Sequence, residues 1–103
     1  MEIKEAQDIV YEHLKKVGYT KIETEPTHAF LHLIEELGEV ARTLLYKTTP
    51  RAKLKNTTDP GNINDEIADI FWQTLKLASY LDLDLEECFI AKLEKNRNKP
   101  KKP

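Results

Sequence analysis

Acidic residues in the middle of the chain stand at spacings that favour a shared site. In chain order they are Glu35, Glu36 and Glu39 within LIEELGEV, then Glu66 and Asp69 within DEIAD. If both stretches are helical, each offers two carboxylates at i and i+3, which project from the same side of a helix. Carboxylates held close together repel one another, so either a cation joins them or one of them takes up a proton.

Carboxylate oxygens are ligands that suit Mg²⁺ or Mn²⁺ better than Zn²⁺. A di-iron site is disfavoured because helical bundles that bind two irons use Glu-x-x-His pairs. The one pair with that spacing is Glu25 and His28, and Pro26 interrupts it at the expected start of a helix. The plain alternative is a solvated acidic face, which is what a lone ExxE on a helix usually indicates. ExxE followed by ExxD on the next helix is harder to explain in that way.

Four helices are expected to position these acids, and no stretch alternates as a strand requires. The expected helices cover residues 2–17, 27–47, 63–81 and 85–98. Residues 48–62 are rich in Thr, Asn, Pro and Gly and are typical of a loop. Asn62 is a candidate cap for the third helix, and Asp84 for the fourth. The sequence therefore predicts an all-α four-helix bundle.

The two acidic helices are expected to run antiparallel, so that their carboxylate pairs face each other across the helix pair. At ~1.5 Å of rise per residue the pairs differ in height by under ~10 Å, which the long loop can absorb. On the second helix Leu37 and Leu44 mark an apolar side away from the acids. On the third, apolar residues cover more than half of the circumference, an arc that needs several neighbours. A homodimer is therefore the favoured packing.

Composition and charge limit the classes of protein to which the chain can belong. Its 103 residues suit one domain, assigned to residues 1–99, and the basic tail of residues 100–103 is expected to be disordered. A net charge of −2 favours neither nucleic acid nor a membrane surface as a partner. Cys88 stands alone, which fits a cytoplasmic setting, and it is expected to pack in the core. No apolar run approaches the ~20 residues of a membrane span, and no signal pattern opens the sequence.

At its acidic stretches the sequence resembles the MazG-like, all-α nucleoside triphosphate pyrophosphohydrolases. The family pattern is EExxE, a spacer and then ExxD, and it stands here as EELGE at residues 35–39 and EIAD at residues 66–69. The similarity continues through EIADIFWQTLKLASYLDLDLEE and the closing AKLEKNRNK. It therefore spans nearly the whole chain, to about Lys99.

The resemblance implies a Mg²⁺-dependent enzyme, with Mn²⁺ as a substitute ion. It implies cleavage of a (deoxy)nucleoside triphosphate to the monophosphate and pyrophosphate, which would remove surplus or unwanted nucleotides, in a dimer or a dimer of dimers. The metal ligands it implies are Glu36, Glu39, Glu66 and Asp69. Glu35 joins Glu36 and Glu39 as a catalytic residue that orients a ligand or helps to polarise water. A carboxylate not fully committed to the metal can serve as general base.

Three other residues are assigned to substrate binding. Lys92 and Asn96 lie four residues apart on the fourth helix. The resemblance favours contacts of Lys92 with a phosphate and of Asn96 with a sugar or phosphate, over a lysine at the edge of the core. Gln73, one turn beyond Asp69, faces the acidic side and is placed to touch the nucleotide.

The aromatic and histidine residues near the motif have two interpretations each. Trp72 is expected to pack in the core, with base stacking as the alternative. His28 and His32 are expected to pair with Glu35 or Glu36 at the surface, with a base pocket as the alternative. Two other functions remain open, namely phosphoribosyl-ATP pyrophosphohydrolase and a non-catalytic helical interaction module.

Overall fold

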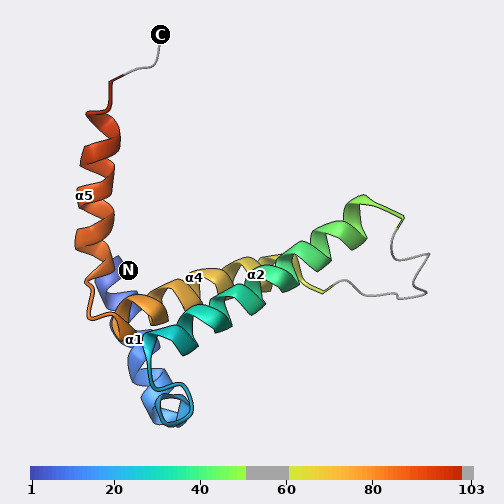
Figure 1. Ribbon diagram of the computed structural model, residues 1–103, viewed down its shortest axis with the longest axis horizontal. Coiled ribbons are helices and arrows are strands. Elements are labelled where there is room, and N and C mark those ends of the chain that lie inside the picture. The colour runs from blue at the N-terminus through green and yellow to red at the C-terminus, as the bar shows by residue number, and fades with distance from the viewer. Residues whose placement is uncertain (51–60, 101–103) are drawn as a thin grey trace.

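The computed structural model describes residues 1–50 and 61–100, and these residues form helices and their connections (Figure 1). The α-helices are α1 (Ile3–Lys16), α2 (Pro26–Thr48), α4 (Ile63–Tyr80) and α5 (Leu85–Arg97). A turn of 3-10 helix, η1 (Tyr19–Lys21), links α1 to α2. The described ranges contain no strand, which confirms the predicted all-α class. Residues 51–60 of the expected loop and 101–103 of the expected tail lie outside the described residues.

The helices begin and end at local signals, and the four expected ranges agree with the observed bounds to within one residue. The Asn62 side chain accepts hydrogen bonds from the backbone N–H groups of Asn64 and Asp65, which caps α4 as expected. The Asp84 side chain accepts from the Glu87 N–H at the start of α5. Gly18 follows α1 with φ +87°, a left-handed conformation that glycine adopts without strain.

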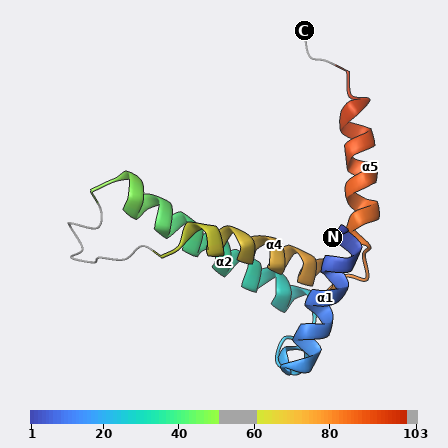
Figure 2. The same cartoon turned by 180° about the vertical axis from the view of Figure 1, so that it is seen from behind.

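Helices α2 and α4 lie side by side as a long pair, and both views of the molecule show this arrangement (Figures 1 and 2). Helix α1 packs across α4, and their contact forms the core from Val10, Leu14 and Leu75. Trp72 packs against this cluster, as expected. Helix α5 packs on α1 and extends away from the α2–α4 pair (Figure 1). None of its residues is buried.

One side of α2 is apolar yet uncovered within the single chain. Phe30, Ile34, Leu37 and Leu44 are each close to half exposed, at 49%, 46%, 44% and 46%. Their spacing of three, four or seven residues places them on one stripe of the helix. We call these four residues the α2 apolar stripe.

Two smaller points complete the description of the fold. The prediction that Cys88 packs in the core is wrong, because this residue is exposed on α5, a helix that touches little beyond α1. Among the described residues, no helix is both long and apolar enough to cross a membrane.

Candidate functional site

A cavity of about 270 Å³ lies beside the acidic residues, between α1, η1, α2 and α4. We call it the acidic cavity. Glu36 lines it from α2, and Asp69 and Gln73 line it from α4. The Tyr19 and Trp72 rings contribute to its wall. The fold thus brings one carboxylate from each predicted motif to the same hollow.

Glu36 lies in an acidic and poorly hydrated environment, since its side chain is 14% exposed. Its pKa is raised above the ordinary glutamate value, chiefly because burial disfavours the charged form. The negative charges of Glu39 and Asp69 raise the pKa further, whereas His32 lowers it. Three of the predicted acids therefore lie close enough to repel one another.

Glu66 is held between the two long helices by a residue outside the acidic motif. Only 8% of the residue is exposed, and its Oε1 accepts a hydrogen bond of 2.7 Å from the Thr43 hydroxyl on α2. Gly61 passes close to this pair with φ +101°, and a Cβ at that position would lie 2.5 Å from Glu66 Oε1. A glycine is required there both by the backbone conformation and by the space.

A buried polar network borders the acidic cavity on the η1 side. Lys76 of α4 is 1% exposed, and its Nζ donates to Glu23 Oε1 at 2.6 Å and lies 2.8 Å from His32 Nδ1. His32 Nδ1 is also 2.9 Å from Glu23 Oε2, and its Nε2 is 3.3 Å from Glu36 Oε1. The His32 ring stacks on Tyr19 with 6.1 Å between ring centroids.

The expected pairing of His32 with Glu36 is present, whereas the same expectation for His28 is wrong. His28 Nδ1 accepts from the Thr24 N–H, and its Nε2 lies 3.7 Å from Glu25. Both of these contacts lie at the start of α2, because His28 is too near that end of the helix to reach the acids.

The structure adds functional candidates that sequence reasoning missed, namely Glu23, Thr43, Gly61 and Lys76. The position of Lys76 was a usable signal, since it follows Asp69 by two helical turns and therefore shares its face. Glu23 has no such signal, because a fold contact between η1 and α4 places it.

The remaining predicted residues are not gathered at the cavity. Glu35 and Glu39 are exposed on α2. Lys92 and Asn96 are exposed on α5, which extends away from the α2–α4 pair (Figure 1). Within the described ranges, no group of three His, Cys, Asp or Glu side chains stands ready to hold one metal ion.

The donor set nevertheless suits a hard divalent cation. Glu36 Oε2 and Glu66 Oε2 are both buried, and neither has a hydrogen-bond partner among residues 1–50 and 61–100. A buried carboxylate oxygen without a partner is costly, and a cation that coordinates it removes that cost. Oxygen ligands of this kind are those that Mg²⁺ and Mn²⁺ prefer.

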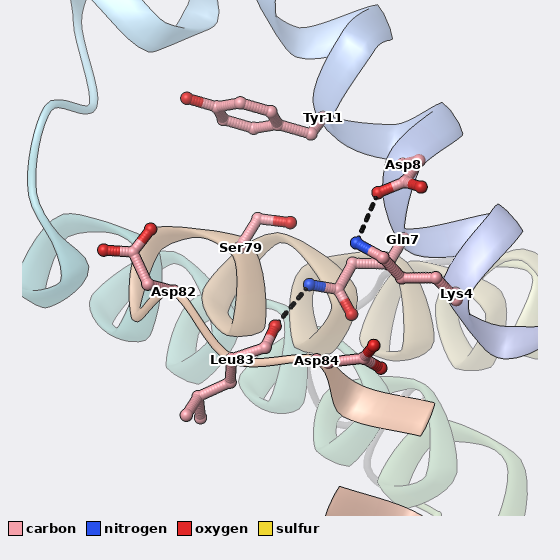
Figure 3. A pocket seen from close by; sticks show the side chains of 8 residues that line it. All are labelled: Lys4, Gln7, Asp8, Tyr11, Ser79, Asp82, Leu83 and Asp84. Carbon is pink, nitrogen blue, oxygen red and sulfur yellow. Dashed lines mark hydrogen bonds and ion pairs between the residues drawn. The ribbon is translucent and has the colours of Figure 1, made fainter. Parts of the chain in front are cut away.

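A second, larger cavity of about 360 Å³ lies between α1 and the α4–α5 connection (Figure 3). Its central polar group is Gln7, which donates to the Leu83 carbonyl at 2.7 Å and accepts from the Leu85 N–H at 3.0 Å. Lys4 pairs with Asp8 at 2.9 Å on its rim. These polar groups are already hydrogen-bonded or ion-paired within the protein. We therefore assign the cavity to the packing of α1 against the α4–α5 connection and not to the acidic site.

Comparisons with known proteins identify the family of the chain. The MazG nucleotide pyrophosphohydrolase domain model matches residues 24–102. The uncharacterized protein YpjD of Bacillus subtilis (strain 168) is 37% identical over 62 residues, which cover 60% of this chain. The chain spans 55% of the length of that relative. No solved structure matches the chain. From its acidic pair of helices and the match over most of its length, the chain belongs to the MazG nucleotide pyrophosphohydrolase family.

Proposed function

We propose that this protein hydrolyses (deoxy)nucleoside triphosphates to the monophosphate and pyrophosphate with the help of Mg²⁺, for which Mn²⁺ can substitute. The observation that carries this proposal is the approach of Glu36 and Asp69 at one cavity, with Glu36 Oε2 buried and without a hydrogen-bond partner from any described residue. The cellular role that fits is the removal of surplus nucleotides. Family membership supports the reaction type.

Glu36, Glu39, Glu66 and Asp69 are the residues that would hold the metal. When bound, the ion supplies neutralisation of the triphosphate charge and acidifies water. No three acidic side chains among the described residues already stand as one ligand group, so Glu39 and Asp69 would reach a bound ion only after a change of side-chain conformation. Glu35 is exposed on α2 and uncommitted to the metal in this proposal, so we assign it to accept the proton of the attacking water. Water adds to phosphorus, and pyrophosphate leaves.

Substrate binding is proposed to combine the acidic cavity with a second subunit. Gln73 lines the cavity, and its buried Oε1 has no partner within the described ranges, which supports a role in accepting a hydrogen bond from a bound nucleotide. Lys92 and Asn96 extend on α5 away from the cavity of their own chain, so we propose that they meet the phosphates or sugar bound by another subunit. The homodimer or dimer of dimers is part of this proposal.

The test is incubation of the purified chain with a panel of nucleoside and deoxynucleoside triphosphates, and separately with phosphoribosyl-ATP, with and without Mg²⁺. Products are identified by ³¹P NMR. The expected result is Mg²⁺-dependent release of pyrophosphate and a monophosphate from members of the first panel. Turnover of phosphoribosyl-ATP alone would assign the other pyrophosphohydrolase function. No turnover, together with no thermal shift on adding Mg²⁺, would favour the interaction module.

A further inference from the structure

The buried network of Lys76, Glu23 and His32 ends at a carboxylate of the acidic site. Lys76 is enclosed at 1% exposure, and the side chains of Glu23 and His32 are 18% and 20% exposed. The contacts run from Lys76 Nζ to Glu23 Oε1 and His32 Nδ1, at 2.6 Å and 2.8 Å. From His32 Nε2 the next step is Glu36 Oε1 at 3.3 Å. One chain of contacts thus joins Glu23, which follows η1, to His32 of α2 and Lys76 of α4.

The neighbours of His32 favour particular positions for its hydrogens, with Lys76 and Glu23 both close to Nδ1 at 2.8 Å and 2.9 Å. An ammonium group only donates, so Lys76 is satisfied at 2.8 Å when His32 Nδ1 accepts. A neutral imidazole with Nδ1 as acceptor carries its hydrogen on Nε2, the nitrogen that faces Glu36. An imidazolium, which would donate from Nδ1 to Glu23, also carries a hydrogen on Nε2. The neutral form without it donates from Nδ1 to Glu23 at 2.9 Å but sets the Nε2 lone pair against the Glu36 carboxylate, and the neutral form with it sets the Nδ1 lone pair against Glu23. We infer the forms with a hydrogen on Nε2, because they alone give Glu36 a donor.

The consequence for Glu36 is an oriented carboxylate. In either form with a hydrogen on Nε2, that N–H faces Glu36 Oε1 at 3.3 Å, whereas Oε2 is buried and has no partner among the described residues. Groups behind a metal ligand commonly fix it in this way. We propose that Lys76 and Glu23 are positioning residues that act through His32 to hold Glu36 so that Oε2 is the oxygen offered to a divalent cation. This inference rests on the proposed function, because it assigns Glu36 to the metal.

The test is the affinity of the full chain for Mn²⁺, measured by isothermal titration calorimetry without nucleotide. Loss of a group behind a metal ligand typically costs about 10–100-fold in affinity, which is the loss expected for both Lys76→Met and His32→Leu. The Mn²⁺ affinity of the double variant should lie within about twofold of that of the single variant with the lower affinity. Both changes break the same chain of contacts, so their effects should not add. His32→Gln should recover most of the affinity, because its amide nitrogen can donate toward Glu36.

Tyr80→Phe is the matched control for simple loosening of this region. The Tyr80 hydroxyl donates to the backbone carbonyl of Glu23, so its loss weakens the same junction without removing a side-chain contact of the network. It should lower stability and leave Mn²⁺ affinity within about twofold of the original chain. A second readout is the ¹⁵N spectrum of the metal-free protein, in which His32 Nε2 should carry a hydrogen.

The outcomes separate this inference from the proposed function. Mn²⁺ affinity within about twofold of the original chain in folded His32→Leu would overturn it, even if Lys76→Met fails to fold. An equal loss in Tyr80→Phe would also overturn it, as would an unprotonated His32 Nε2. If the original chain binds Mn²⁺ and the variants lose it while no nucleotide is hydrolysed, the positioning role stands and the proposed function fails. If the original chain does not bind Mn²⁺, the positioning role fails as well.

Discussion

At the scale of single residues, the two buried carboxylates of the acidic site are held in similar ways. Thr43 donates to one oxygen of Glu66 at 2.7 Å, and His32 stands 3.3 Å from one oxygen of Glu36. In both cases the second oxygen is buried and has no partner in the part of the chain that the structure describes. Each glutamate therefore has one oxygen engaged by the protein and one available to a cation, although they come from different helices.

The spacing of the acids was enough to predict that α2 and α4 bring Glu36 and Asp69 to the same place. Residues at i and i+3 share a face, and the neighbouring helices were expected to be antiparallel. Spacing was not enough to predict the residues behind them. Thr43 looks like an ordinary helical residue, and a lysine such as Lys76 is almost always solvated. Its burial depends on Glu23, which reaches it through tertiary contact.

Removal of either proposed ligand charge should stop catalysis without unfolding the chain. Both Glu39→Gln and Asp69→Asn concern exposed carboxylates, so the helices should remain. Loss of an interaction with the metal is worth several kcal/mol of transition-state stabilisation, so pyrophosphate release should fall at least ~100-fold. The measurement is pyrophosphate release at saturating Mg²⁺, with circular dichroism to check helicity. Asp8→Asn on α1 is the control, and unchanged release in both variants would refute the assignment of the site.

Replacement of Thr43 by valine should affect both stability and metal binding. The variant Thr43→Val keeps the shape of the side chain but leaves Glu66 Oε1 without its donor, at a cost of about 1–3 kcal/mol in the free energy of unfolding. It should also weaken Mn²⁺ binding, because Glu66 is no longer fixed. Urea denaturation and calorimetry measure the two effects. Thr43→Ser retains the hydroxyl, so equal Mn²⁺ affinity in the two variants would contradict the positioning of Glu66.

At the scale of elements, η1 and the start of α2 are tied to α4 by side chains from a single helix. Lys76 reaches the Glu23 carboxylate, and the Tyr80 hydroxyl donates to the Glu23 backbone carbonyl. Both residues come from α4 and lie four positions apart, hence on one face. The short segment between α1 and α2 is thereby fixed beside the acidic cavity.

The bounds of the helices were predictable because their signals are local. Pro26 opens α2, Asn62 and Asp84 cap α4 and α5, and Gly18 follows α1. The direction of α5 was not predictable. Its exposed apolar residues, such as Phe89 and Ile90, give no clear stripe from which a neighbour could be inferred. What α5 packs against is a property of tertiary contact and not of its own sequence.

The hydrogen bond from the Tyr80 hydroxyl to the Glu23 backbone carbonyl should weaken at high pH. Its pKa is raised from the ordinary value of 10.0, mainly because burial disfavours the phenolate, and then because of Glu23 and Tyr11. The folded chain therefore keeps this proton at pH values where the unfolded chain has released it, so the free energy of unfolding falls as pH rises from about 10 upward. Tyr80→Phe has no such proton and lacks this fall.

The measurement is urea denaturation of both proteins between pH values of about 9 and about 11. At the lower pH the original chain should exceed Tyr80→Phe in the free energy of unfolding by about 1 kcal/mol, the usual worth of one hydrogen bond. The difference should shrink toward the higher pH. A difference that stays constant or grows over this range would show that the tie does not depend on this proton.

At the scale of the whole molecule, the chain offers more apolar surface than its own helices cover. The α2 apolar stripe is exposed, and Ile67 and Phe71 of α4 are 54% and 52% exposed. Large exposed apolar patches typically mark an interaction site. Helix α5 extends away from the α2–α4 pair (Figure 2) and does not cover this surface.

The association of two chains is expected to show as a doubled mass in solution. Light scattering should give about 24 kDa, twice the 12.0 kDa of one chain, or about 48 kDa for a dimer of dimers. Ile34→Glu puts a charge on the α2 apolar stripe and should weaken association at least ~10-fold, because an unpaired charge would be buried. Ile22→Glu, at a residue 70% exposed and outside the stripe, is the control. A mass of about 12 kDa for the original chain at micromolar concentration would reject the dimer.

Because Lys76 is enclosed, its chemical reactivity shows whether the folded protein stays closed around it in solution. An amine that solvent cannot reach is also shielded from acylating reagents, so brief treatment with acetic anhydride should acetylate the surface lysines and spare Lys76. Mass spectrometry of the digested protein would measure that protection. Labelling of Lys76 at the rate of exposed Lys92 would mean that the network opens readily in solution.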